Sequence, residues 1–218
     1  MLSLLLLLMG PLCLALALWL AWPLWSRWRE QGQVDRRIAT LGDQHLRGVL
    51  LEDGMGGHSY YDWLLLTPDG FCLLVSKAHQ GNIFAGERLE HWTQVIGSRS
   101  YHFSNPLFEL EPLRATLRYH FPKMPLQAAV VFTGSCRFPK GHPDGVLTRE
   151  QLPEAARLHA IPLSQQQAWE QLKAKVRRPD PLLEQHLLDA SPWQSSRAIS
   201  ALLLAVSGGL MMLGGWLW

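Results

Sequence analysis

The sequence predicts one α/β domain with a transmembrane helix at each end of the chain. All charged residues lie between Arg27 and Arg197, and each charge-free end is long enough to cross a bilayer, because about 20 apolar residues span its hydrocarbon core. Between the ends, segments with strand-like alternation occur together with segments of helical period. The expected parts are a transmembrane helix at 1–26, a domain at 27–160, a helical juxtamembrane extension at 161–197 and a transmembrane helix at 198–218.

The first charge-free segment is predicted to remain in the protein as an anchor. It has no basic residue before its apolar run, and Arg27 and Arg29 follow it directly, whereas a cleaved signal peptide has the opposite charge order. Tryptophans recur every third position from Trp19 to Trp28, as in an aromatic belt at a membrane surface. Cleavage near the alanines of this segment is the alternative.

The second charge-free segment begins after Arg197, so the basic flanks of both segments border the central domain. The positive-inside rule therefore predicts a two-pass protein of the inner or plasma membrane, with the domain in the cytoplasm and both termini outside. Small residues at four-residue spacing in both segments would allow close helix packing, so a homo-oligomer through the transmembrane helices is expected as one partnership. Because such residues are common in any membrane helix, the oligomeric state stays open.

The first elements of the domain follow from apolar spacing and turn residues. A helix is expected at 35–46, then a strand at 49–52 and a flexible glycine turn at 54–57. Residues 60–77 are expected to form a hairpin, because Pro68 presets a turn dihedral and the following glycine supplies a positive φ. Alternation along the second strand of the hairpin places four residues on one face, namely Phe71, Leu73, Val75 and Lys77.

The later elements include both helices and a buried strand. A helix is expected from Asn105-Pro106 onward, because leucines recur there on one face. Residues 126–132 are almost continuously apolar, which predicts a strand buried on both faces. Further helices are expected at 163–176 and 182–188, the second of them leading to the membrane.

Several motifs of the domain, taken as a set, resemble the nuclease-related domain (NERD) family in order and spacing. They are the hairpin from Asp62 to Lys77 and the runs Gly81–Gly86, Trp92–Gln94, Asn105–Leu107 and Ala129–Gly134. The resemblance covers residues 32–152. It implies a restriction-endonuclease-like fold of the PD-(D/E)xK type, with a mixed sheet flanked by helices.

The resemblance also implies candidate catalytic residues. Asp62 matches the metal-binding aspartate of the family, and Lys77 matches the lysine of its Glu-x-Lys motif, but Val75 stands in place of the motif glutamate. Asp35 is the nearest match to an acid on the first helix of the family, and Glu109 follows the Asn-Pro-Leu run where the family often has a glutamine. Gln33 is the other candidate for the position on the first helix, and Glu111 lies close behind Glu109. Asp35, Glu109 and Glu111 are candidates for a displaced metal ligand, and a solvated surface acid is the alternative for the two glutamates.

Three functions remain open on the sequence. The favoured one is a membrane-tethered, nuclease-like domain with lost or weakened catalysis that retains binding of nucleic acid or of a protein partner, because Val75 cannot ligate a cation. The second is an active Mg²⁺-dependent endonuclease in which Asp35 or Glu109 replaces the missing acid, so Mg²⁺ is expected only if the protein is active. The third is a membrane scaffold that kept the fold without the chemistry.

The charge of the chain points to the membrane more than to nucleic acid. A net charge of +2 is too small to indicate nucleic-acid binding by itself. Basic residues gather between Lys173 and Arg178, ahead of the second charge-free segment. Contact with anionic lipid headgroups is the favoured use of this cluster, and contact with nucleic-acid phosphates is the alternative.

The topology can be tested with reporters. A reporter fused after Trp218 should be active only outside the cytoplasm, and one inserted in the turn at 54–57 should report the cytoplasm, because the basic residues flank the central domain. An external signal from the inserted reporter would contradict this topology and favour a cleaved signal.

Overall fold

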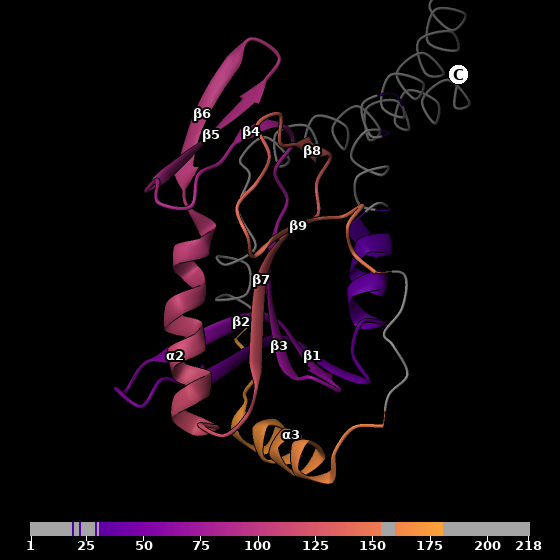
Figure 1. Cartoon of the computed structure of the whole chain (residues 1–218), viewed down its shortest axis with the longest axis vertical. Helices are drawn as coiled ribbons and strands as arrows, with labels where there is room; N and C mark the ends of the chain where they lie inside the picture. The colour runs from indigo at the N-terminus through magenta and orange to yellow at the C-terminus, as the bar shows by residue number, and fades with distance from the viewer. Residues whose placement is uncertain (1–18, 20–21, 23–28, 30, 154–159, 181–218) are drawn as a thin grey trace, which may run out of the picture. The chain divides into compact units, whose positions relative to one another are not determined.

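The computed structural model describes residues 19, 22, 29, 31–153 and 160–180, and its fold lies within the compact unit Gln33–Glu184 (Figure 1). The predicted transmembrane segments fall outside these residues apart from Trp19 and Trp22, as does the predicted helix at 182–188. Within the described ranges, no helix is long and apolar enough to cross a membrane.

The described elements alternate strands with a few helices. The strands are β1 (Gln44–Glu52), β2 (His58–Thr67), β3 (Gly70–Lys77), β4 (Gly81–Phe84), β5 (His91–Ile96), β6 (Arg99–Ser104), β7 (Leu126–Phe132), β8 (Cys136–Arg137) and β9 (Val146–Thr148). The helical elements are residues 31–39, the 3₁₀ helix η1 (Pro106–Glu109), α2 (Leu110–His120) and α3 (Leu163–Lys175).

A five-stranded sheet, in the order β1-β2-β3-β7-β9, is the larger of the sheets in the described part of the chain. The first three strands are antiparallel, whereas β7 runs parallel to β3 and β9 parallel to β7. The mixed sheet and the strand β7 are as predicted, although full burial of β7 is limited to Val130–Phe132 and Gln127 is exposed. The hairpin, in which Thr67 pairs with Gly70 at a φ of 115°, is also as predicted. A side chain at Gly70 would bring its Cβ to 2.3 Å from the carbonyl oxygen of Pro125, so both the backbone angle and the space require glycine.

A smaller sheet has the order β6-β5-β4-β8. The β5–β6 pair extends beyond the end of α2 in Figure 1. Ile83 of β4 and Trp92 of β5 are buried and belong to the same core cluster as the larger sheet. The two sheets are therefore packed as parts of one domain.

Both faces of the larger sheet are covered. On one face lies the larger core, to which α2 contributes Leu110 and α3 contributes Trp169. On the other face lies a smaller core that includes Val34 and Ile38 from the helix at 31–39. Figure 1 shows this helix and α2 on opposite sides of the sheet.

Strand β3 shows the predicted alternation. Phe71, Leu73 and Val75 belong to the larger core, whereas Leu74 belongs to the smaller one. Because β3 is paired on both edges and buried on both faces, it is the centre of the domain.

The first helix lies earlier in the chain than predicted. Helical residues end at 39, and the chain from Gln44 onward, expected to complete the helix, forms β1 instead. The N–H of Asp43 donates to the carbonyl of Leu66 at 2.8 Å, and a Cβ on Gly42 would lie 2.9 Å from the same oxygen. Close pairing with β2 therefore outweighs the local helical period in this segment.

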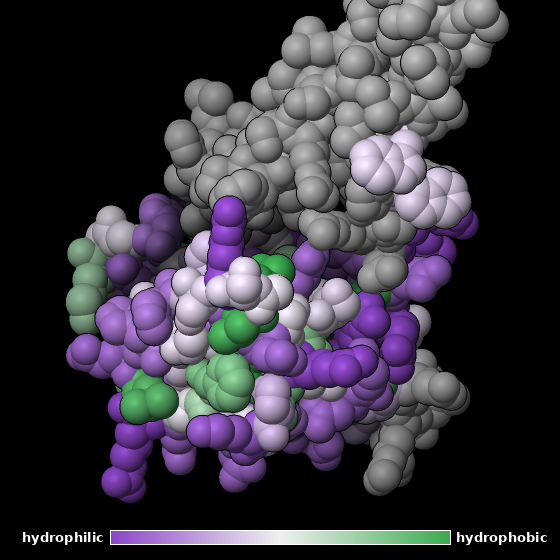
Figure 2. Space-filling model, turned by 90° about the horizontal axis from the view of Figure 1, so that it is seen from above, coloured by the Kyte–Doolittle hydropathy of each residue, from purple (hydrophilic) through white to green (hydrophobic). Residues whose placement is uncertain are grey.

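The described surface carries no large apolar patch on the face seen in Figure 2. Hydrophilic residues cover most of the coloured surface there, and apolar residues form small separate areas. Scattered exposed apolar residues of this kind are normal for a globular domain.

Leu74 gives a test of the core assignment. Leu74 is 2 % exposed in the smaller core, so a Leu74→Asp substitution should prevent cooperative folding, since burying an unpaired carboxylate costs several kcal/mol against a total stability of about 5–15 kcal/mol. Gln127→Asp, at an exposed position of β7, is the matched control and should leave the melting transition, followed by circular dichroism, nearly unchanged. An unchanged transition in the Leu74 variant would show that the central strand is misplaced.

Candidate functional site

The candidate site lies where β2 and β3 separate. Pairing between these strands ends at Trp63 and Leu74, while β3 continues to pair with β7 as far as Lys77. Asp62 therefore lies in the fork where β2, still paired with β1, separates from β3, which stays paired with β7.

Asp62 bridges this fork through its carboxylate. Its Oδ2 accepts hydrogen bonds from the backbone N–H of Ser76 at 2.8 Å and from the Ser76 hydroxyl at 3.1 Å. Burial raises the pKa of Asp62, and the Ser76 donors and the nearby charge of Lys77 act in the opposite direction. The charge of Glu109 also raises this pKa, so Lys77 and Glu109 both lie within electrostatic reach of Asp62.

Lys77 and Glu109 form an ion pair. The Lys77 Nζ lies 2.8 Å from both carboxylate oxygens of Glu109, and the two side chains are 27 % and 45 % exposed. Glu109 is held there by Asn105, whose side chain caps η1 by accepting from the Leu107 N–H at 3.0 Å and donating to the Leu89 carbonyl at 2.9 Å. The Asn-Pro-Leu run thus has a structural role, because it delivers the following helix to the end of β3.

Position 75 belongs to the core. Val75 is 5 % exposed and packs in the larger core cluster together with Phe71 and Leu73 of the same strand face. The residue predicted to stand in place of the motif glutamate therefore contributes to packing.

Asp35 lies in a different group of side chains. Its Oδ2 accepts from Arg47 Nη2 at 2.8 Å, and the Arg47 guanidinium lies 4.9 Å from the centre of the Trp63 ring. Burial raises the pKa of Asp35, and Arg47 opposes this increase. Of the candidates from the sequence, the fold thus brings Asp62, Lys77 and Glu109 together, and it places Asp35 beside Arg47.

His79 is a neighbour of the site that the motifs did not single out as functional. Its Nδ1 lies 3.3 Å from Gln94 Oε1, and its ring stacks on Phe103 with 4.0 Å between centroids. Burial lowers the pKa of His79 and outweighs the hydrogen bond with Gln94, which acts in the opposite direction. Its position two residues after Lys77 was the one signal available in the sequence.

The arrangement combines one bonded carboxylate with one ion pair. In the described ranges, no group of three or more histidine, cysteine, aspartate or glutamate residues is arranged to hold a metal ion. The fork thus offers hydrogen-bonding and charged groups from β2, β3 and the start of α2.

Comparison with known proteins identifies one family. Residues 27–133 match the family model described as the nuclease-related domain, NERD. The matched range ends after β7 and contains Asp62, Val75, Lys77 and Glu109. Neither a comparison with curated proteins nor one with solved structures found a match.

The raised pKa of Asp62 has a consequence for stability. Because the folded-state pKa lies above the unfolded-state value, the contribution of Asp62 to stability is most favourable below the unfolded pKa and is lost as the pH rises through the folded pKa. An Asp62→Asn variant keeps an oxygen acceptor for Ser76 and cannot ionise. We expect its melting temperature to exceed that of the parent at pH 7, and the difference to shrink toward pH 3.

Thermal unfolding over a pH series measures this difference, with Asp69→Asn in the exposed hairpin turn as the control. A lower melting temperature of the Asp62 variant at pH 7 would show instead that the ionised carboxylate stabilises the fork.

Proposed function

We propose that this chain, which carries a nuclease-related domain over residues 27–133, is a membrane-anchored protein whose nuclease-like site is catalytically degenerate and whose domain binds nucleic acid or a protein partner. The observation that carries the proposal is Val75. It stands where the family motif has a glutamate, and its side chain is buried in the larger core.

The donors around the fork do not fit a Mg²⁺ site. Mg²⁺ requires near-octahedral oxygen ligands and is usually bound through one or two carboxylates. Asp62 uses one oxygen for two Ser76 donors, Glu109 directs both oxygens to Lys77, and Val75 has no ligand atom. Asp62 is instead bonded to Ser76 and Glu109 is paired with Lys77, which supports a structural use of these positions.

Membrane anchoring is supported by the distribution of charge along the chain. Residues 1–26 and 198–218 contain no charged side chain, and basic residues stand at the inner border of each segment. With both ends inserted, the domain would work beside the cytoplasmic leaflet.

An active Mg²⁺-dependent endonuclease is the second candidate. The observation in its favour is that Glu109 lies against Lys77 and its charge acts on Asp62. If a substrate phosphate took over Lys77, Glu109 would become available as the second carboxylate. Asp62, Lys77 and Glu109 would then be the catalytic set.

A substitution at position 75 tests the degenerate site. In Val75→Glu, the buried and unpaired carboxylate should lower the melting temperature without metal, and Mg²⁺ or Mn²⁺ should restore part of the loss if this side chain shares a pocket with Asp62. Val75→Gln is the matched control, because it has a similar size without charge and should lose stability without recovery. A folded Val75→Glu variant whose melting is unaffected by either metal would show that positions 62 and 75 do not face one pocket.

Cleavage assays distinguish the two candidates. The full chain, incubated with Mg²⁺ or Mn²⁺ and plasmid DNA, single-stranded DNA or RNA, should show little cleavage, and Lys77→Ala should change little. Robust cleavage that both Asp62→Asn and Glu109→Gln abolish would overturn the degenerate site and establish the active enzyme.

A further inference from the structure

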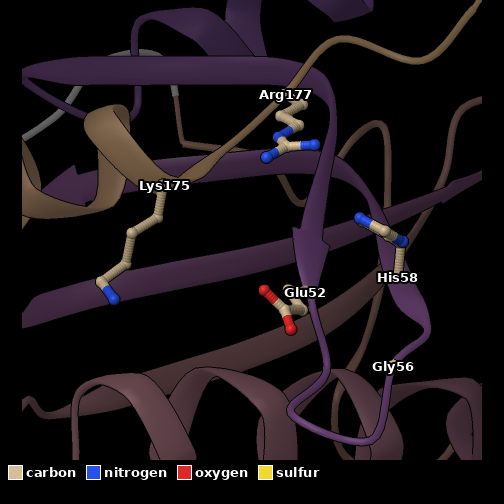
Figure 3. A pocket seen from close by; sticks show the side chains of 5 residues that line it. All are labelled: Glu52, Gly56, His58, Lys175 and Arg177. Carbon is tan, nitrogen blue, oxygen red and sulfur yellow. The ribbon is translucent and has the colours of Figure 1, made fainter.

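A second charged pocket lies outside the fork. It is lined by Glu52 at the end of β1, Gly56 in the following loop, His58 at the start of β2, and Lys175 and Arg177 at the end of α3. Its volume is about 260 Å³. Figure 3 shows the charged side chains around one open space, with the Glu52 carboxylate among the basic groups.

The walls of this pocket are held by backbone hydrogen bonds. The Arg177 N–H donates to the Leu50 carbonyl at 2.9 Å, and the Leu50 N–H donates to the Arg177 carbonyl at 2.8 Å. On the other side, Asp53 Oδ1 accepts from the N–H groups of Met55 at 2.8 Å and Gly57 at 2.9 Å. The pocket is therefore formed before any ligand arrives, which reduces the ordering cost of binding.

The charges in the pocket have no partners of their own. In the described part of the chain, Lys175, Arg177 and Glu52 make no ion pair, whereas neighbouring Lys173 is paired with Glu170 at 2.6 Å. Basic and acidic side chains thus line one small space without neutralising each other directly. A ligand that satisfies them must carry both signs of charge.

We propose that this pocket binds a phosphoethanolamine group. The phosphate would accept charge-assisted hydrogen bonds from Lys175 and Arg177 and a further bond from the His58 ring, and the ammonium would pair with Glu52. Inorganic phosphate or a nucleic-acid phosphate carries no cation for Glu52. The volume lies just below the range of about 300–1,000 Å³ typical of sites for drug-sized ligands, which suits a small headgroup.

Of the molecules that contain a phosphoethanolamine group, the lipid phosphatidylethanolamine is the one favoured by the sequence that follows the pocket. From Arg177 the chain continues toward the charge-free segment that starts at Ala198, so the pocket belongs to the part of the domain that leads to the proposed membrane anchor. This choice of source rests on the membrane anchoring of the proposed function, whereas the pocket chemistry does not. Soluble phosphoethanolamine is the other source of the same group.

Lipid titrations of the full chain in a sugar-based detergent test the proposal. Binding of short-chain phosphatidylethanolamine, short-chain phosphatidylglycerol and soluble phosphoethanolamine is measured by calorimetry, so the result does not depend on anchoring or on nuclease activity. The ethanolamine lipid should bind best. Lys175→Gln and Arg177→Gln should each weaken it about tenfold, because each removes a hydrogen bond to a charged group. Equal binding of the soluble ester would confirm the pocket chemistry and assign it to that ester.

The controls separate a pocket from a diffuse basic surface. Arg178→Gln changes the adjacent exposed arginine, which does not line the pocket, and should leave the affinity within about twofold of the parent. Glu52→Gln should shift the preference from the ethanolamine lipid to the glycerol lipid. Equal losses in the Arg177 and Arg178 variants, an unchanged preference in the Glu52 variant, or no binding by the folded parent would each overturn the proposal. Melting curves of each variant confirm that the fold is intact.

Discussion

Strand β3 pairs with β2 along one edge and with β7 along the other, and its two faces are buried in two separate cores. Every other described part of the domain is arranged around this strand: α2 and α3 cover the larger core, and the helix at 31–39 covers the smaller one. A strand buried on both faces accepts apolar side chains at almost every position. Valine at position 75 satisfies that requirement fully, whereas an acid there needs a cation or another partner to offset the loss of hydration.

The central position of β3 also explains how the Asp62 side chain is accommodated. Where β2 leaves β3, the backbone N–H of Ser76 needs an acceptor, and the Asp62 carboxylate supplies it. Lys77 similarly finds Glu109 at the start of α2. Asp62 therefore forms hydrogen bonds with Ser76, and Lys77 forms an ion pair with Glu109, so both ends of the fork are held by protein groups. Such partly exposed ion pairs contribute about 0–1 kcal/mol, so their main effect is on geometry.

The domain has two charged regions, the fork and the pocket, which differ in how their side chains are paired. At the fork, each charged group has a protein partner close by. In the pocket between β1 and the end of α3, backbone pairing of Leu50 with Arg177 brings together charged side chains that form no ion pair among the described residues. Paired groups at the fork favour a structural role for that site. The side chains of the pocket remain available to bind a ligand. We therefore place the proposed lipid binding beside the end of α3, which precedes the charge-free segment at 198–218 in the sequence.

Local sequence patterns were enough to predict the hairpin at 60–77, the strand at 126–132 and the resemblance to nuclease-related domains, because turn residues, apolar alternation and motif spacing act over short distances. The helical spacing of apolar residues gave a wrong prediction at residues 44–46, because these residues pair with β2 and form strand. Only the tertiary structure decided that Asp62 bonds to Ser76, that Glu109 rather than Asp35 reaches Lys77, and that Glu52, His58 and Arg177 share a pocket. These contacts join residues far apart in the chain, and their partners depend on strand register and helix placement, which no local pattern encodes.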